Sequence, residues 1–350
     1  AALKSGDTVA TVSLSWGGAG LFPERYAQGK KQFQDAFGVK IVETPNSLKT
    51  DELSDNPQLR LDDLMAAFKN PEIKAILTNI GGSDTVRLLS LMNEKHFEII
   101  HNNPKIFLGM SDTTANHFMC LKAGLSSFYS PSTLFGYAEN GGTPEYIVNS
   151  VKKTLFDTNP IGILPESKDF IMDKVRWDDK NDIYRERTPA SGWKYIQGNK
   201  KTQGRLVGGC MEVLGMINGT SLWPIVDEWK DTILFVETSE DMLPLDIFVY
   251  FLRNLGAQGI LNNLNGILLG RPGGSFKKDQ VAEKEAWLEK YAKYDKYLLQ
   301  ICKEYGCTDI PIVTHMDFGH TVPQMLLPYG VLTEIDPINK TVSILESGVI

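Results

Sequence analysis

One stretch of the sequence combines residue types that could carry out nucleophilic chemistry. The apolar residues 105–110 run into the turn Gly-Met-Ser-Asp and then into a helix-like segment that reaches His117. A serine in this turn would lie at the carboxyl end of a buried strand, in front of a helix N-terminus. The alternative is that Ser111 or Asp112 only caps the helix, since both residue types are preferred N-caps. Ser111 is therefore a candidate nucleophile that needs partners.

A serine hydroxyl at neutral pH needs a base to become an effective nucleophile. Of the five histidines in the chain, two lie in a polar segment that we expect to be exposed, and a third is rotated away from the serine on the same predicted helix. These three are His96, His101 and His117. The remaining two, His315 and His320, lie near the end of one predicted strand. We favour His320 because it follows a glycine just beyond the strand, whereas His315 still belongs to the strand's own alternation.

A catalytic imidazole also needs a carboxylate that fixes its tautomer and stabilises the imidazolium. Glu237 ends the apolar strand-like run Ile-Leu-Phe-Val and is the carboxylate best positioned by a buried strand. Glu240 and Asp241 follow a few residues later and are typical of an exposed loop or helix start. The chain order Ser, Glu, His is acceptable because such triads are defined by geometry.

An oxyanion site can be predicted beside the serine. Gly81 and Gly82 follow the strand that we expect to lie next to the nucleophile strand, so the backbone N–H groups of Gly82 and Asp112 could converge on a carbonyl oxygen held over Ser111. We expect Gly81 and Ser83 of the same loop to contact the substrate. The alternative is that the two glycines serve only a tight turn.

The predicted elements position these residues at one edge of a sheet. Apolar strand-like segments alternate with amphipathic helical ones, which indicates βαβ units and a parallel sheet of flavodoxin or Rossmann type. Ligands bind at the carboxyl ends of such strands. The predicted strands of the first half are residues 8–15, 39–43, 73–79 and 105–110, and its helices are residues 25–37, 59–68, 84–92 and 143–155. The second half has predicted strands at residues 232–236, 266–269, 310–315 and 341–345 and helices at residues 246–255 and 281–301.

Length and composition predict a two-domain protein of ordinary globular type. At 350 residues the chain exceeds the usual size of one domain, and we expect an N-terminal α/β nucleophile domain at 1–160, a linker with a polar loop at 161–203, and a C-terminal α/β domain at 204–350. The net charge of −7 argues against a general nucleic-acid binder. Without a run of about 20 apolar residues or a signal-peptide pattern, we expect no membrane partner and a cytoplasmic location.

Cofactor and metal motifs are not found in the sequence. It contains no phosphate-binding loop, no dinucleotide-binding glycine pattern and no zinc-binding helix, and its four cysteines are scattered. We therefore expect no cofactor, no metal and no disulfide framework.

Five short motifs together resemble the LD-carboxypeptidase family, and within it the microcin C self-immunity branch. They occur in the family's order and spacing across nearly the whole chain: residues 80–83 (IGGS), 109–113 (GMSDT), 208–214 (GGCMEVL), 234–237 (LFVE) and 318–320 (FGH). The resemblance implies a serine peptidase with a Ser-Glu-His triad split between the two domains, usually a cytoplasmic homodimer. Its expected reaction is cleavage of an amide bond near the C-terminus of a small peptide conjugate through an acyl-enzyme.

The substrate depends on the branch. Muropeptide-cleaving members tend to carry Arg-Gly-Gly where this chain has Ile80-Gly-Gly, so the resemblance favours a peptidyl-nucleotide and a role in self-immunity. In that branch a loop tryptophan is thought to stack on the adenine, which points to Trp177, with Trp193 as the second choice. The alternatives are that both tryptophans hold the linker against the second domain, that the substrate is a muropeptide, or that the chain is a non-catalytic small-molecule binding protein.

Overall fold

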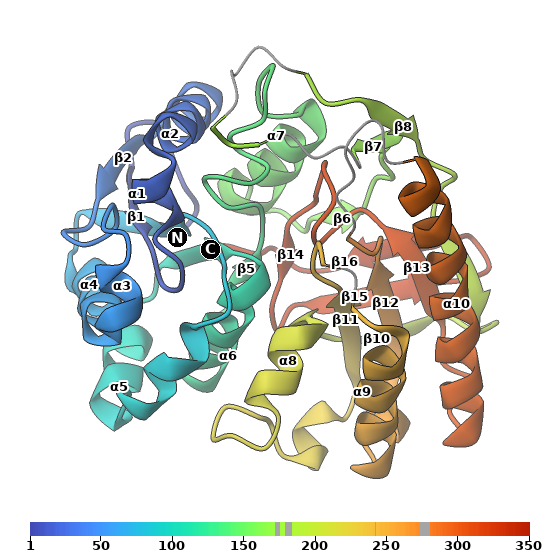
Figure 1. Cartoon of the computed structure of the whole chain (residues 1–350). Helices are drawn as coiled ribbons and strands as arrows, with labels where there is room; N and C mark the ends of the chain where they lie inside the picture. The colour runs from blue at the N-terminus through green and yellow to red at the C-terminus, as the bar shows by residue number, and fades with distance from the viewer. Residues whose placement is uncertain (172–175, 179–183, 242, 274–280) are drawn as a thin grey trace.

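The chain forms two large β-sheets that lie side by side, each flanked by helices (Figure 1), and the described residues also include a small antiparallel sheet of residues 169–171 and 187–189. The computed structural model describes residues 1–171, 176–178, 184–241, 243–273 and 281–350. The two termini lie next to each other, and the backbone N–H of Ala2 donates to the carbonyl of Ile350 at 2.8 Å.

The first sheet has the strand order β14-β5-β4-β3-β1-β2, and the strands β1 to β5 are parallel. This is the flavodoxin order, which confirms the predicted fold class, and its order reverses between β1 and β3. The first half contains the strands β1 (Thr8–Val12), β2 (Lys40–Glu43), β3 (Ile73–Thr78), β4 (Ile106–Gly109) and β5 (Phe128–Tyr129). Its helices are α1 (Gly18–Leu21), α2 (Pro23–Phe37), α3 (Glu52–Asp55), α4 (Pro57–Lys69), α5 (Glu94–Asn102), α6 (Thr114–Lys122) and α7 (Glu145–Val151), with the short helices η1 (Thr85–Ser90), η2 (Ser111–Thr113) and η3 (Lys152–Phe156).

Local sequence signals explain where α2 begins and ends. Pro23 occupies the first helical position, where its missing N–H is not needed. Gly38 ends the helix in the left-handed conformation, with φ of 67°, and its N–H donates to the carbonyl of Gln34.

Two predicted helices differ from those observed. The segment expected to be an α-helix at 84–92 is the tighter 3₁₀-helix η1, whose start is held by hydrogen bonds from the amides of Asp84 and Thr85 to the Asp112 carboxylate. The helix expected at 143–155 begins at Glu145 and continues after Val151 as the π-helical turn η3.

The second sheet has the order β6-β16-β15-β10-β11-β12-β13-β9. Its central strands β10 to β13 are parallel, and antiparallel strands complete both edges. The strands of the second half are β6 (Gly162–Ile163), β7 (Asp169–Ile171), β8 (Arg187–Pro189), β9 (Lys194–Gln197), β10 (Thr202–Cys210), β11 (Thr232–Glu237), β12 (Leu264–Gly270), β13 (Ile312–Met316), β14 (Leu327–Pro328), β15 (Leu332–Asp336) and β16 (Thr341–Ile344). Its helices are α8 (Met211–Ile217), α9 (Leu245–Ala257) and α10 (Val281–Glu304), with η4 (Val226–Trp229) and η5 (Leu261–Asn263).

Short strands that the sequence did not predict extend both sheets. The segment 161–203, expected to be a linker, contributes β6 and β9 to the second sheet, while β14 from the second half pairs with β5 of the first sheet. Residues 172–175 and 179–183 of this segment lie outside the described part of the chain.

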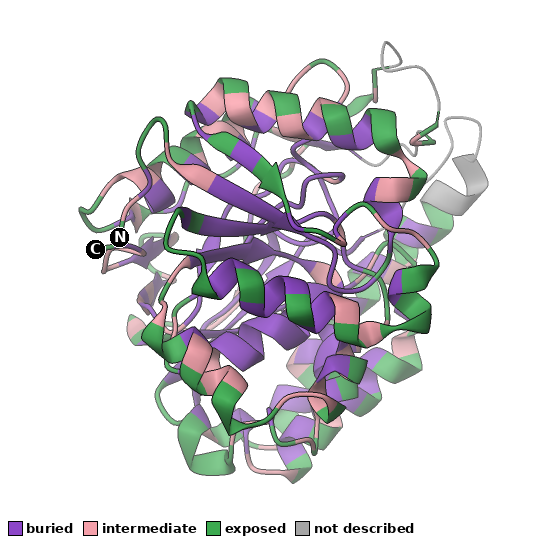
Figure 2. Cartoon of the chain, turned by 90° about the vertical axis from the view of Figure 1, so that its left-hand side faces the viewer, coloured by how far each residue is buried: buried purple, intermediate pink, exposed green. Residues whose placement is uncertain are grey.

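Figure 2 shows that the strands are mostly buried, whereas many helices alternate between buried and exposed positions. One continuous core therefore includes side chains from both sheets, among them Phe107, Tyr129, Phe235 and Tyr329.

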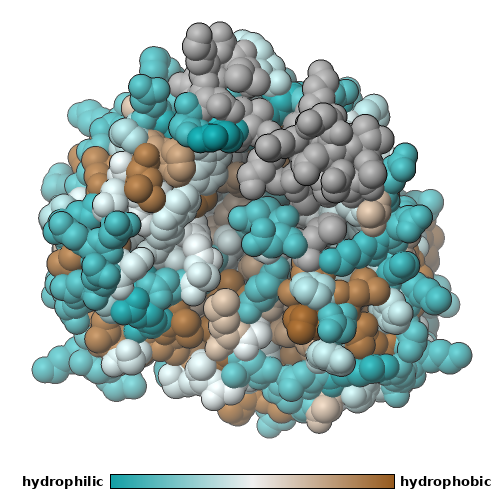
Figure 3. Space-filling view, viewed as in Figure 1, coloured by the Kyte–Doolittle hydropathy of each residue, from teal (hydrophilic) through white to brown (hydrophobic). Residues whose placement is uncertain are grey.

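On the face shown in Figure 3, hydrophobic residues gather in several separate groups among hydrophilic ones. No helix among the described residues is long and apolar enough to cross a membrane.

Trp193 joins the segment 161–203 to the second sheet. Its indole N–H donates to Asp317 Oδ2 at 2.8 Å, and the side chain is only 8% exposed. Asp317 Oδ2 also accepts the backbone N–H of Ser167 at 2.9 Å, and Asp317 Oδ1 pairs with Arg271 at 2.8 Å. The Trp193 ring is thus occupied in the core, so the structure does not support it as a stacking residue for substrate.

Replacing Trp193 by Phe should lower the free energy of unfolding by about 2 kcal/mol, because a buried hydrogen bond to a charged acceptor is lost. Urea denaturation measures this change. The matched control is Trp223→Phe, which removes an indole hydrogen bond of 3.0 Å to the neutral amide of Gln258 at a half-buried site. Equal losses in the two variants would contradict the structural role of the Trp193–Asp317 bond.

Candidate active site

Ser111 lies in a strained turn between β4 and α6. Its φ of 59° is in the left-handed region, which a residue with a side chain seldom adopts. Gly81 packs directly against it, since a Cβ on Gly81 would lie 2.8 Å from Ser111 Cβ and 3.0 Å from its Oγ. The serine is therefore presented at the carboxyl end of β4 next to the loop that follows β3, as expected for a nucleophile elbow.

Glu237 and His320 form a buried pair. Glu237 ends β11 and is fully buried, and its Oε2 lies 2.7 Å from His320 Nδ1. The same oxygen accepts the backbone N–H of His320 at 3.1 Å. The structure thus brings together the predicted base and the predicted carboxylate, and it orients the imidazole through Nδ1.

Tyr129, which the sequence analysis did not single out, connects this pair to the serine. Its hydroxyl lies 2.5 Å from Glu237 Oε1 and accepts the backbone N–H of Ser111 at 3.0 Å. Ser111 and Glu237 are therefore separated by a single phenol oxygen.

The second ring nitrogen of His320 faces a different acid. Its Nε2 lies 3.3 Å from Glu240 Oε2, and within the described residues the Ser111 hydroxyl makes no hydrogen bond. Burial lowers the pKa of His320, but the charge and hydrogen bond of Glu237, with Glu240 and Glu212 adding to them, raise it to about 9. These acids therefore stabilise the imidazolium form that His320 takes once it has accepted a proton.

The other histidines have structural partners. His117 is fully buried between Ser127 Oγ and the carbonyl of Gly109, and burial lowers its pKa to about 3. His315 stacks on Tyr291 and lies 3.2 Å from Asp295. The remaining two have local contacts: His96 caps the start of α5 and His101 contacts the carbonyl of Ala123.

Asp112 has a structural role that its sequence position does not reveal. Its buried Oδ2 accepts hydrogen bonds from Ser15 Oγ at 2.5 Å and from the amides of Asp84 and Thr85 at 2.8 Å each. The carboxylate therefore connects the elbow to the loops that follow β1 and β3.

Of the predicted oxyanion donors, Gly82 lies in the loop after β3 and Asp112 in the elbow itself. Among the described residues, the backbone N–H groups of Gly82 and Asp112 have no hydrogen-bond partner. The Asp112 nitrogen is 3.1 Å from the position of a Cβ on Gly81, and Gly82 has a φ of 143°. Gly81 is buried against the serine, while Gly82 and Ser83 are exposed.

Trp177 belongs to an aromatic group that forms around the loop after β1. Its ring stacks on Trp16 at 6.1 Å and meets the edge of Phe22 at 5.5 Å, and the Arg25 guanidinium lies 5.9 Å from it. Ile80, next to the predicted oxyanion loop, packs against the buried cluster of Ala19, Tyr26 and Leu134, and Trp177 packs against the same cluster. The structure thus places Trp177 near the serine's side of the sheet, with one face covered by Trp16.

Cys210 lies beside the pair, and its Sγ is within 4.8 Å of ligand atoms of Glu237 and His320. Such a trio could hold a metal ion. However, burial and the charges of Glu237 and Glu212 raise the pKa of the thiol well above its ordinary value, which disfavours a thiolate ligand or nucleophile. The absence of a metal remains a prediction.

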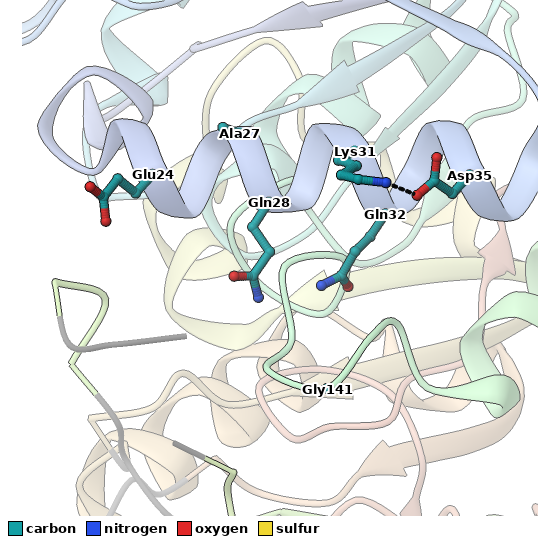
Figure 4. Close-up of a pocket in the computed structure, with 7 residues that line it drawn as sticks. All are labelled: Glu24, Ala27, Gln28, Lys31, Gln32, Asp35 and Gly141. Carbon is teal, nitrogen blue, oxygen red and sulfur yellow. Dashed lines mark hydrogen bonds and ion pairs between the residues drawn. The ribbon is translucent and has the colours of Figure 1, made fainter. Parts of the chain in front are cut away.

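A surface hollow of about 530 Å³ lies elsewhere, between α2 and Gly141 (Figure 4). Gln28 and Gln32 point into it, but their amides donate to carbonyls of the segment 138–139. Lys31 pairs with Asp35. With none of the predicted site residues in its lining, this hollow is a poor candidate for the reaction site.

Two family models match the two halves of the chain. The LD-carboxypeptidase N-terminal domain matches residues 9–130, which include β1 to β5 and the elbow. The LD-carboxypeptidase C-terminal domain matches residues 203–335, which include Glu237 and His320. The chain belongs to the LD-carboxypeptidase family. It is therefore a carboxypeptidase-type hydrolase by family.

Members of this family resemble the chain over almost its full length. YocD of Bacillus subtilis, a putative carboxypeptidase, is 29% identical, with 97% of the chain and 96% of YocD covered. The microcin C7 self-immunity protein MccF of Escherichia coli is 27% identical over 99% of the chain and 95% of MccF. Its structure with aspartyl sulfamoyl adenosine has a TM-score of 0.85 at 25% identity, covering 100% and 99% of the two chains.

An MccF-like protein from Streptococcus pneumoniae, solved in complex with AMP, shares 30% identity and a TM-score of 0.85. The match covers 97% of this chain and 98% of that protein.

The charge around His320 can be tested directly. Glu240→Gln should lower the pKa of His320 by roughly half a unit, because a negative charge near Nε2 favours the imidazolium and solvent screens a half-exposed acid. NMR titration of ¹³C-labelled histidine would follow the change. Glu228→Gln, at an exposed acid on η4, is the control and should leave the titration unchanged. A His320 pKa that stays constant in Glu240→Gln would rule out this contribution.

Proposed function

We propose that the chain is a serine hydrolase in which Ser111 is the nucleophile, His320 the general base and acid, and Glu237 the carboxylate that orients it. The observation that carries the proposal is the strained Ser111 turn, one phenol oxygen away from a buried carboxylate that fixes His320 through Nδ1. Strain of this kind concentrates at functional sites. A serine that served only as a helix cap would not need a left-handed φ.

In the proposed reaction, Ser111 Oγ attacks the carbonyl carbon of the scissile amide while His320 Nε2 takes its proton. The developing oxyanion accepts hydrogen bonds from the backbone N–H groups of Gly82 and Asp112. His320 then gives the proton to the leaving amine, which departs and leaves an acyl-enzyme. Water attacks the ester with His320 again as base, releasing the carboxylic acid and the free serine.

The proposed substrate is a small peptide joined to a nucleotide. MccF has been solved with aspartyl sulfamoyl adenosine and the pneumococcal MccF-like protein with AMP, so both bind adenine nucleotides or analogues. The group formed by Trp16, Phe22 and Trp177 supplies flat apolar surfaces near Ile80, which suit a nucleobase. Hydrolysis of a peptidyl-nucleotide antibiotic would give self-immunity or resistance. Action in the cytoplasm as a homodimer belongs to the same proposal and comes from the family resemblance.

A fluorophosphonate probe tests the triad without knowledge of the substrate. Ser111→Ala should abolish labelling, His320→Ala should slow it by about three orders of magnitude or more, and Glu237→Gln should slow it somewhat less. His315→Ala should label close to the wild-type rate in protein that remains folded by circular dichroism. Loss of labelling in His315→Ala with retention in His320→Ala would reverse the assignment of the base. An unlabelled wild-type chain would favour the non-catalytic binding protein.

Trp177→Ala should raise KM for a peptidyl-adenylate about tenfold or more, because a lost base stack is worth roughly 1–3 kcal/mol. Cleavage of a muropeptide tetrapeptide, which has no base, should remain unchanged. Steady-state kinetics on the two substrates provides the measurement, and Trp223→Ala serves as an aromatic control away from the site. Equal effects on both substrates, or a lower melting temperature without selectivity, would favour a structural role for Trp177 and a muropeptide substrate.

A further inference from the structure

Tyr129 occupies an unusual position between the two halves of the proposed triad. It ends β5, where it pairs with Gly109 of the nucleophile strand, and its side chain is 1% exposed. The ring contacts Phe235 on β11 at 5.6 Å, two residues before Glu237. The phenol thus reaches from the first sheet to the carboxylate strand of the second.

The direction of its hydrogen bonds is determined by chemistry. The Ser111 backbone N–H can only donate, so the phenol oxygen accepts from it at 3.0 Å. The ionised Glu237 carboxylate can only accept, so the phenol hydrogen points to Oε1 at 2.5 Å. Burial, followed by the charge of Glu237, raises the pKa of Tyr129 well above its ordinary value, so the phenol keeps this hydrogen.

We propose that Tyr129 is a positioning residue for catalysis, which holds the nucleophile turn through the Ser111 N–H and sets the basicity of His320 through Glu237 Oε1. This role rests on the proposed function of Ser111, Glu237 and His320. A Ser-Glu-His triad does not by itself require such a residue. The packing of the two sheets places Tyr129 between Ser111 and Glu237.

Two consequences follow from the geometry. The Ser111 N–H is occupied by Tyr129, so the oxyanion must be bound by other amides, and those of Gly82 and Asp112 have no partner among the described residues. The bond to Oε1 also disperses part of the carboxylate charge that attracts the His320 imidazolium. Removing the phenol hydroxyl should therefore strengthen that attraction and raise the pKa of His320.

Tyr129→Phe in the full chain tests this role through the pH dependence of fluorophosphonate labelling. The labelling rate should fall about tenfold or more at neutral pH. In the plot of labelling rate against pH, the midpoint of the rising limb should move toward alkaline pH by about half a unit to one unit. The matched control is Tyr329→Phe. Tyr329 is equally buried, contacts Phe235 at 5.2 Å, and donates to the carbonyl of Gly208 at 2.7 Å. It should leave the midpoint of the limb unchanged.

A second variant keeps the test decisive if Tyr129→Phe does not fold. Incorporation of 3,5-difluorotyrosine at position 129 retains the hydroxyl and makes it a stronger donor, so the limb should move toward acid pH. The same replacement at position 329 should not move it. If the wild type is labelled and the variants at positions 129 and 329 have the same midpoint, the role of Tyr129 is overturned while the proposed triad stands. An unlabelled wild type would overturn both.

Discussion

The buried charge of Glu237 is the constraint on which the site depends. A carboxylate removed from water is costly unless donors satisfy its oxygens. Glu237 is fully buried, with two hydrogen bonds from His320 on Oε2 and one from Tyr129 on Oε1. The donors come from different halves of the chain, since Tyr129 belongs to the first sheet and His320 follows β13. The proposed triad can therefore form only when the two sheets pack together, and the pairing of β14 with β5 of the first sheet favours that packing.

Two other buried carboxylates organise the loops around the site in the same way. Asp112 accepts hydrogen bonds from the loops after β1 and β3, which places the predicted oxyanion donors beside Ser111. Asp317 binds Arg271, Trp193 and the Ser167 amide, which fixes the segment 161–203 next to the loop that carries His320. The loop sequences themselves favour no single conformation strongly. Each acid fixes them through charge-assisted hydrogen bonds, which are stronger than neutral ones.

The sequence contained enough information for the fold class and for the placement of Ser111, Glu237 and His320, because buried parallel strands leave continuous apolar runs and each of these residues follows such a run. It could not reveal the role of Tyr129. A strand of two residues shows no alternation of buried and exposed positions, and the partners of Tyr129, Ser111 and Glu237, lie far from it in the sequence. Glu240 resembled an exposed loop acid, and its half-exposed side chain agrees with that, but its contact with His320 Nε2 arises only from tertiary packing. The pairing of β6 and β9 was missed for the same reason, because strands of two and four residues are too short to show an alternation.

The contacts of the site divide into a fixed inner set and a more exposed outer set. On the inner side, Gly81, Tyr129 and Glu237 are buried and hold Ser111 and His320 in one arrangement. On the outer side, Glu240 is 50% exposed against His320 Nε2, and Trp16 is 37% exposed against Trp177. The proposed reaction needs Nε2 to face the serine and a ring face to meet the nucleobase, so a bound substrate must replace both outer contacts. Because exposed pairs of this kind are weak, substrate binding can exchange them without disturbing the inner set. The rigid geometry thus lies with the nucleophile, and the adjustable part lies where the substrate enters.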